Sequence, residues 1–304
     1  MRLALHINDY AALGNPRQLG PTLARVARAA EQAGFARLSL TDHLWQISLL
    51  GEQDEPMLEA YTALGYLAGQ TRSIELQTLV TAATYRPPGL LAKMVTTLDV
   101  LSGGRACLGI GAGWNEEEAA GLGLPFGPAG ERYARLEETL RICLQMWSDR
   151  AEPFVGEYYQ LGSTLNIPVP LSRPRPRILV GGGGERRTLR LAAKYADAFN
   201  VFGGPDAGQK VTRLREHCEA IGRDHGEIEK TAVLPVPVPA AHGDGGHFAE
   251  GLLDELRRLH ELGFTTVYAV VPGNAGPGST GPGVGAVAPV EQLGEKVIPE
   301  ISGW

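Results

Sequence analysis

The chain has 304 residues and a mass of 32.4 kDa, with 28 Lys and Arg against 34 Asp and Glu and a formal net charge of −6. This acidic balance argues against nucleic acid or a membrane surface as a partner, because both attract basic patches. The sequence has no apolar run of about 18 residues and no N-terminal signal region, and its three cysteines are widely spaced. We therefore expect a cytoplasmic globular protein with reduced thiols.

Short apolar segments alternate eight times with segments of helical periodicity. The predicted strands are residues 3–7, 36–40, 74–83, 106–111, 178–180, 199–202, 231–238 and 266–271. The predicted helices are 19–30, 56–69, 88–101, 132–147, a segment ending at 195, 211–221, 252–259 and 290–301. Because parallel strands need crossover helices, this alternation predicts a parallel sheet.

Eight strand–helix units without a linker predict an α/β fold, a (β/α)8 TIM barrel formed by one domain over residues 1–304. Residues 150–176 break the rhythm with prolines and glycines, and we expect them to form an insertion after the fourth unit. The Gly- and Pro-rich loop 273–286 is expected to be flexible. An open doubly wound sheet is the competing architecture, but residues 8–14 lack the dinucleotide-binding loop that it would need.

Asp42 and His43 follow the second strand, where the active site of such a barrel lies. An imidazole beside a carboxylate can exchange a proton near neutral pH. In the alternative interpretation, Asp42 caps the next segment and His43 fills the rim. We favour the functional interpretation; His6, at the end of the first strand, is a weaker candidate because its side chain could equally pack inside.

Four consecutive glycines, residues 181–184, follow the fifth strand and precede Glu185, Arg186 and Arg187. Glycine lets the main chain approach a ligand, and the first N–H groups of a helix attract an anion. A tight turn is the alternative, but it does not need four glycines. The segment therefore predicts a phosphate site, and the missing Lys-Ser/Thr pair argues against ATP.

Glycines at 109, 111 and 113 end the fourth strand and precede Trp114 and Asn115. Small residues here leave room for a flat ring against the main chain, and Asn115 or Glu116 is suited to cap the next helix. Trp114 could equally be a packing residue.

The sequence lacks the motifs that are typical of metal sites and of serine nucleophiles. The histidines include no His-x-His pair, and no Gly-x-Ser-x-Gly elbow is present. We expect no metal.

An ordered set of motifs resembles the bacterial luciferase-like monooxygenase family. The motifs are Thr41-Asp42-His43, Gln77-Thr78-Leu79-Val80-Thr81, Tyr85-Arg86-Pro87-Pro88, Leu101-Ser102-Gly103-Gly104-Arg105, Gly109-Ile110-Gly111-Ala112-Gly113-Trp114-Asn115-Glu116-Glu117-Glu118, Pro174-Arg175-Pro176, 178–184, Arg187 and Ala192-Ala193-Lys194-Tyr195-Ala196-Asp197-Ala198. They cover the chain to about residue 203, and the remainder shares only the barrel rhythm.

The resemblance implies that coenzyme F420, a deazaflavin, or FMN binds over the carboxyl ends of the strands. Its phosphate would lie at 182–186 and its ring against the third and fourth strands, where a non-prolyl cis peptide is implied between Leu79 and Val80. The implied cofactor-binding residues are Asp42, Thr78, Leu79, Val80, Gly111, Ala112, Gly113, Asn115, Gly182, Gly183, Gly184, Glu185 and Arg186. His43 would be catalytic, and the residues implied to face the substrate are His6, Trp45 and Trp114.

The Gly-x-Gly-Trp-Asn-Glu run is similar to the F420-using branch of the family. We therefore expect hydride transfer between F420 and a small organic substrate, with His43 exchanging the accompanying proton. Some dehydrogenases of this branch carry a catalytic glutamate where this chain has Trp114, which argues against a sugar phosphate. The alternatives are an FMN-dependent monooxygenase supplied by a separate reductase and a non-catalytic cofactor-binding protein. We also expect a homodimer and a flavin or F420 reductase or dehydrogenase as partner.

Overall fold

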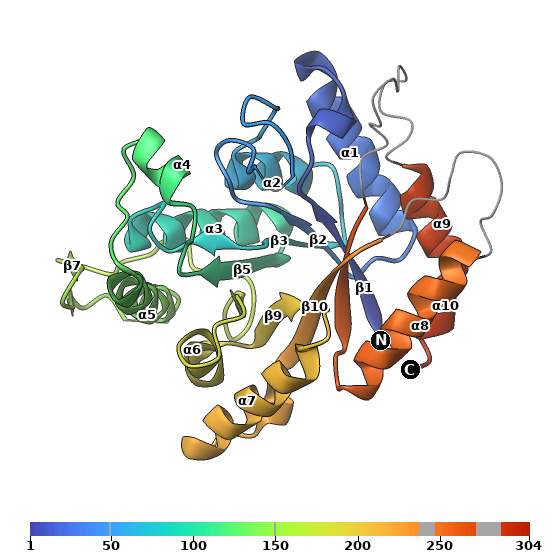
Figure 1. Cartoon of the computed structure of the whole chain (residues 1–304). Helices are drawn as coiled ribbons and strands as arrows, with labels where there is room; N and C mark the ends of the chain where they lie inside the picture. Colours follow the sequence, from blue (N-terminus) through green and yellow to red (C-terminus); the bar gives the residue numbers. More distant parts are fainter. Residues whose placement is uncertain (49, 149, 237–246, 272–286) are drawn as a thin grey trace.

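The computed structural model describes residues 1–48, 50–148, 150–236, 247–271 and 287–304, and a closed ring of parallel strands forms its centre (Figure 1). The ring consists of β1 (Arg2–Ile7), β2 (Arg37–Leu40), β3 (Glu75–Thr78), β4 (Thr81–Ala82), β5 (Ala106–Gly111), β8 (Arg177–Gly181), β9 (Ala198–Phe202), β10 (Glu229–Pro235) and β11 (Thr266–Val270). The strand order is β3-β2-β1-β11-β10-β9-β8-β5-β4, and pairing of β3 with β5 closes the ring. The predicted (β/α)8 TIM barrel is confirmed.

The third predicted strand, residues 74–83, is divided in two. β3 ends at Thr78, β4 begins at Thr81, and the peptide bond between Leu79 and Val80 is cis. Both short strands pair with β5, so the chain leaves the ring for two residues and then rejoins it. The cis peptide implied by the family resemblance is therefore confirmed at the expected bond.

Helices cover the outside of the ring. They are α1 (Pro16–Gln32), α2 (Ala60–Ala68), α3 (Pro88–Ser102), α4 (Glu116–Gly121), α5 (Ala129–Met146), α6 (Thr188–Tyr195), α7 (Ala207–Ala220), α8 (His247–Glu261), α9 (Ala288–Lys296) and α10 (Ile298–Ile301), with 3₁₀ turns at Ala11–Leu13 and His225–Glu227. Within the described parts of the chain, no helix is both long and apolar enough to cross a membrane.

Several predicted helix boundaries differ from the structure. The second helix begins at Ala60 rather than at 56, because the Glu59 side chain caps it by accepting hydrogen bonds from the Tyr61 and Thr62 amides. The last predicted helix, 290–301, is divided before Pro299, which lacks an N–H and lies in the first turn of α10. The short helix α4 was absent from the prediction.

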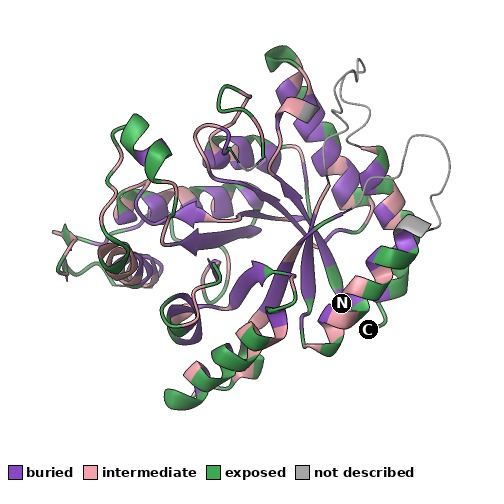
Figure 2. Cartoon of the chain, in the orientation of Figure 1, coloured by how far each residue is buried: buried purple, intermediate pink, exposed green. Residues whose placement is uncertain are grey.

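Buried residues make up most of the strands and the helix faces that pack on them (Figure 2), and the apolar ones form two cores. The large core lies between the ring and the helices. The small core fills the inside of the barrel and contains Ala4, Leu179, Ala198 and Tyr268. Leu79, beside the cis peptide, packs against this inner core and is only partly buried.

Ion pairs close the N-terminal end of the barrel. The Arg37 guanidinium, 2% exposed, lies 2.6 Å from Glu75 and 3.5 Å from Glu229. Arg2 and Arg177 each pair with Glu229 at 2.7 Å. Burial opposes ionisation of Glu229, but the surrounding arginines hold its pKa below the usual value. Charged side chains thus seal the end opposite to the predicted active site.

The segment between α5 and β8 includes residues 150–176, whose origin as an insertion stays a prediction. It contains a small antiparallel hairpin, β6 (Phe154–Val155) with β7 (Gln160–Leu161), outside the ring. The Glu138 carboxylate of α5 accepts hydrogen bonds from the amides of residues 157–159 and so fixes the hairpin turn. The predicted flexible loop 273–286 lies outside the described residues.

Candidate functional site

Three glycines surround the cis peptide at the carboxyl end of the barrel. A Cβ on Gly181 would lie 2.7 Å from Cγ1 of Val80, and one on Gly111 would lie 3.1 Å from its Cγ2. A Cβ on Gly109 would lie 1.9 Å from the carbonyl oxygen of Thr78. The Thr78 hydroxyl, fully buried, donates to the Gly109 carbonyl at 2.8 Å. The ends of β3, β5 and β8 therefore meet closely because the last two carry no side chain there.

His43 stands just beyond β2, with its side chain 13% exposed. Its Nδ1 lies 2.7 Å from Oε2 of Glu118, in the first turn of α4. The edge of its ring meets Trp114, with ring centroids 5.5 Å apart and planes at 72°. Trp114 itself is 62% exposed and follows Gly113 at the end of β5. The contact places His43 beside the glycine-lined end of β5.

The Glu118 carboxylate is completely buried and receives several hydrogen bonds. Its Oε1 accepts from the Leu44 amide and, at 3.3 Å, from the Trp45 amide. Its Oε2 accepts from the Tyr85 hydroxyl as well as from His43. Burial by itself would raise the pKa of Glu118, but these donors lower it below the usual value, so the group is ionised.

Asp42 is turned away from the mouth of the barrel. Its carboxylate is fully buried and receives two bonds from Arg86, at 2.6 and 3.0 Å. Arg86 also contacts the Glu59 carboxylate and stacks over the Tyr61 ring at 4.8 Å from its centroid. The Asp42 side chain thus anchors the start of the loop that carries His43, and its predicted cofactor contact stays a prediction.

The glycine run after β8 exposes main chain to solvent. Gly182 and Gly183 are exposed, and Gly182 has a φ of +125°, which disfavours other residues. Around a Cβ placed on Gly183, the nearest atom is Cε of Lys210 at 4.0 Å. The helix begins only at Thr188, after a turn, so the predicted helix start is displaced by a few residues. The space beside Gly183 is open for an approaching ligand.

The two charged residues after the glycines face different ways. The Glu185 carboxylate is bound to Lys210 of α7 at 2.9 Å and is therefore engaged within the protein. Arg186 is exposed and has no ion pair with any residue that the structure describes. Of these two side chains, only that of Arg186 is free to contact a ligand.

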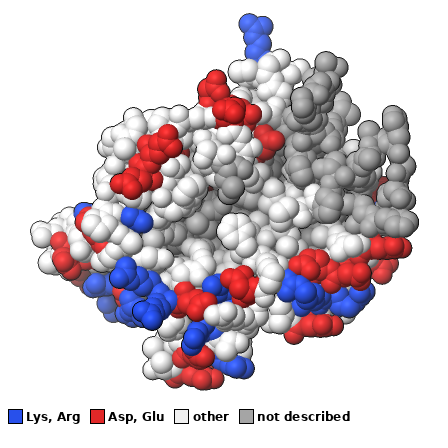
Figure 3. All heavy atoms as spheres, viewed as in Figure 1, with Lys and Arg blue, Asp and Glu red and all other residues white. Residues whose placement is uncertain are grey.

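Two further arginines have no carboxylate partner among the described residues. Arg187 is exposed and stacks on Tyr133, with its guanidinium 5.6 Å from the ring centroid. Arg132 donates to the carbonyls of Gly113 and Gly127, at 3.2 and 2.6 Å. Figure 3 shows Lys and Arg side chains gathered where α5 and α6 lie in Figure 1. Arg186 and Arg187 are therefore two exposed cations directly after the glycine run.

The structure places the other predicted site residues as follows. His6 is buried, with Nδ1 2.9 Å from the Ser39 hydroxyl, and burial lowers its pKa to about 4. The Asn115 side chain caps α4 by accepting from the Glu118 amide at 3.2 Å. The Trp45 ring lies against α4, since a Cβ on Gly121 would be 2.1 Å from it. Ala112 and Gly113 are partly exposed at the mouth.

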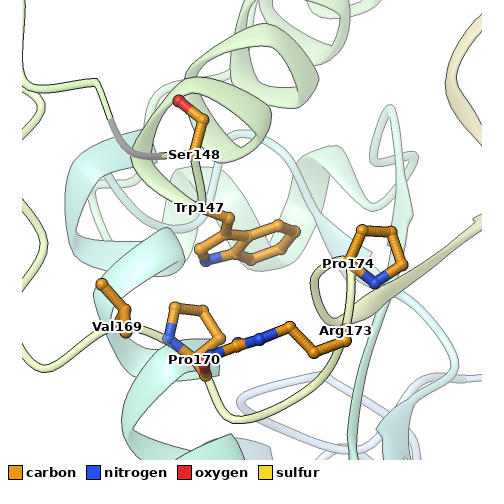
Figure 4. Close-up of a pocket in the computed structure, with 6 residues that line it drawn as sticks. All are labelled: Trp147, Ser148, Val169, Pro170, Arg173 and Pro174. Carbon is orange, nitrogen blue, oxygen red and sulfur yellow. The ribbon is translucent and has the colours of Figure 1, made fainter.

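A cavity of about 420 Å³ lies elsewhere, beside the end of α5 (Figure 4). It is lined by Trp147, Ser148, Val169, Pro170, Arg173 and Pro174. The Trp147 indole N–H donates to Thr96 of α3, and the Arg173 guanidinium donates to the Pro170 carbonyl. None of the predicted site residues lines this cavity. Among the residues placed by the structure, no group of three or more His, Cys, Asp or Glu could hold a metal ion.

Sequence reasoning missed the partners of the predicted residues. Glu118 and Tyr85 were within recognised motifs, but nothing in the sequence indicated that both contact His43. Arg86 was likewise assigned no role. A usable signal for Glu118 was the predicted Asn115 cap, which starts a helix and places Glu118 on its first turn.

Comparisons with known proteins agree with this geometry. Residues 11–243 match the family described as luciferase-like monooxygenase. An F420-dependent glucose-6-phosphate dehydrogenase of Kineococcus radiotolerans is 34% identical over 216 residues, 69% of this chain and 61% of that protein. A protein of Mycobacterium tuberculosis without an assigned function is 30% identical over 267 residues, 83% of this chain and 88% of its own length.

Solved structures share the fold at low identity. The monooxygenase RslO1 from Streptomyces bottropensis superposes with a TM-score of 0.80 at 18% identity, covering 99% of both chains. An F420-dependent secondary alcohol dehydrogenase in complex with an F420-acetone adduct gives a TM-score of 0.78 at 16% identity, covering 99% of this chain and 98% of that one. The barrel with its cis peptide, the motifs and the family match agree: the chain belongs to the luciferase-like monooxygenase family.

Proposed function

We propose that this protein is an F420-dependent oxidoreductase that transfers a hydride between the deazaflavin and a small organic substrate. The observation that carries the proposal is the His43 imidazole at the mouth of the barrel. One ring nitrogen is bound to a buried carboxylate, and the other has no partner among the described residues. Such an imidazole is suited to exchange the proton that accompanies a hydride.

The residues present fit a phosphorylated tricyclic cofactor. The bare main chain at Gly182 and Gly183 is open to a phosphate, and Gly111 removes side chains from the surface next to Leu79 and Val80. These residues would hold the phosphate and the ring. When bound, the deazaflavin supplies a carbon centre that accepts or releases a hydride.

The chain itself contributes position and a proton. His43 would hold or accept the proton at its free ring nitrogen. The exposed Trp114 indole beside it would cover one side of the imidazole. Positioning of two reactants in a fixed geometry accounts for much of the rate in such enzymes. The side chains of Asp42, Asn115 and Glu185 are engaged within the protein, so any contact of theirs with the cofactor would come from the main chain.

The arginines of the mouth favour F420 over FMN. F420 carries carboxylates beyond its phosphate, whereas FMN ends at one phosphate. Arg186 and Arg187 offer two exposed cationic groups without carboxylate partners in the described structure, which suit a cofactor with carboxylates beyond its phosphate. The F420-dependent relative at 34% identity supports the same choice.

Binding of purified apoprotein to F420 and to FMN, followed by fluorescence at low and high salt, tests this choice. We expect tighter F420 binding that weakens as salt screens the arginines. The double variant Arg186→Ala/Arg187→Ala should reduce F420 affinity more than FMN affinity, while Arg215→Ala, on the outer α7, serves as control. Tight FMN binding with negligible F420 binding would instead favour the FMN-dependent monooxygenase.

Turnover separates the remaining alternative. Binding of either cofactor without turnover on a panel of alcohols, aldehydes, imines and enones would favour a non-catalytic binding protein.

We also propose that residues 1–304 form one domain, because β1 and β11, from opposite ends of the chain, pair in the same ring. The homodimer, the reductase partner and the cytoplasmic location stay predictions.

A further inference from the structure

The carboxylate closest to His43 comes from an element that the sequence did not predict. The position that carries a catalytic glutamate in some related dehydrogenases is Trp114 here, so the mouth lacks that acid. Glu118, from the unpredicted helix α4, instead reaches His43 from the protein side. The carboxylate of this site is therefore buried in the protein next to His43, and it is not exposed at the mouth of the barrel.

We propose that Glu118 is a positioning residue that fixes the Nδ1–H tautomer of His43 and so presents Nε2 as the only proton-exchanging nitrogen. The inference rests on the proposed function for its catalytic meaning. Its structural basis is independent of that function: a buried carboxylate 2.7 Å from Nδ1.

Hydrogen-bond chemistry determines the tautomer. An ionised carboxylate only accepts hydrogen bonds, and a neutral imidazole has one N–H. Nδ1 must therefore carry the hydrogen that faces Glu118, which leaves the lone pair on Nε2. A proton can arrive at or leave Nε2 while the Nδ1–H bond to Glu118 stays intact and the carboxylate stays ionised.

Glu118 cannot act on a ligand directly. The group is completely buried, and four donors occupy its two oxygens. Two of these donors are the amides of Leu44 and Trp45, so the same carboxylate holds the main chain that follows His43. Glu118 thus holds both the imidazole of His43 and the main chain that follows it. Any effect of Glu118 on a ligand must therefore pass through His43.

The other titratable and charged groups around Glu118 and His43 are either neutral or paired with an opposite charge. Tyr85, after β4, donates to Glu118, and burial together with that carboxylate raises the pKa of its hydroxyl, which keeps Tyr85 neutral. Arg86 is matched by Asp42 and Glu59. Glu118 is therefore the one formal charge in hydrogen-bond contact with His43 among the described residues.

Nuclear magnetic resonance of the ¹⁵N-labelled, cofactor-free protein tests the inference without any activity assay. Long-range proton–nitrogen spectra distinguish the two neutral tautomers, and His43→Ala identifies the His43 signals. We expect the Nδ1–H tautomer in the wild type. In Glu118→Gln, which removes the charge and adds an amide that can donate as well as accept, the tautomer should become mixed.

Two matched variants complete the design. Tyr85→Phe keeps the charge of Glu118 and should keep the Nδ1–H tautomer, and Glu118→Asp should restore the tautomer in part. An Nε2–H tautomer in the wild type overturns the proposal whatever the variants do, as does an unchanged tautomer in a folded Glu118→Gln. If the tautomer is fixed but no cofactor binds, the proposed function fails while the positioning of His43 stands.

Discussion

The two ends of the barrel use buried carboxylates in opposite ways. At the N-terminal end, Glu229 is surrounded by Arg37, Arg2 and Arg177, and every one of these partners is a permanent cation. At the carboxyl end, Glu118 is bound by His43, Tyr85 and two amides, and none of these partners is a permanent cation. The first arrangement closes the barrel, and the second leaves one nitrogen available.

The difference shows how one type of buried group serves stability or chemistry. A carboxylate matched by arginines has no proton to exchange, so its network can only hold strands together. A carboxylate matched by an imidazole keeps a titratable atom at the surface of the site. The predictions below test whether the two ends are as separate as this comparison indicates.

The largest effect is expected at the closed end. Arg37→Met leaves the buried Glu229 carboxylate with one cation fewer and removes the ion-pair partner of the partly exposed Glu75, so it should reduce the free energy of unfolding by about 3–5 kcal/mol. Arg2→Met is the matched control, because Arg2 is half exposed and such pairs contribute at most about 1 kcal/mol. Urea unfolding of both variants measures the difference. Equal losses would contradict the central role of Arg37.

His6 is buried on β1 beside Ser39 of β2, and its burial should make stability depend on pH. Burial lowers its pKa to about 4 from 6.5, so as pH falls the unfolded chain takes up the proton first. The contribution is present above pH 6.5 and is lost as pH falls toward 4, by at most about 3 kcal/mol. Unfolding of wild type and His6→Asn across this range isolates the group. A constant difference between the two proteins would show that His6 is not buried neutral.

At the open end, His43→Ala should lower turnover at least tenfold while cofactor affinity stays nearly the same. This tenfold minimum is set below the usual contribution of a general acid or base to the rate, about 10²–10⁴-fold. Steady-state kinetics on a substrate from the panel, with binding measured separately, checks this. His225→Ala, in the 3₁₀ turn before β10, is the control. Unchanged turnover would remove His43 from the mechanism.

The smallest effect is expected at the glycine run. Gly183→Val should weaken cofactor binding about fivefold, close to 1 kcal/mol, because the side chain would occupy the space beside the main chain. The fold should tolerate it, since the nearest atom to a Cβ there is 4.0 Å away. Gly162→Val, with nothing within 4 Å, is the control for adding a β-branched residue. Unaltered binding in Gly183→Val would place the phosphate elsewhere.

The alternation of apolar and helical segments was enough to predict the barrel, because each strand needs a crossover helix to continue a parallel sheet. The family motifs located the cis bond at Leu79–Val80. The sequence did not indicate that this bond divides the third strand. It indicated a helix cap at Asn115 but not the bounds of α4, since a helix of six residues leaves too short a periodic pattern.

Within the site, the sequence by itself placed His43, Trp114 and the glycines at strand ends, because position along a barrel strand is a local property. Only the tertiary structure decided which partner each side chain meets. Asp42 adjoins His43 in sequence yet binds Arg86, whereas Glu118, 75 residues away, binds His43. Hydrogen bonds between loops of different strands depend on how the ring closes, and that closure brings together residues whose spacing in the chain carries no signal.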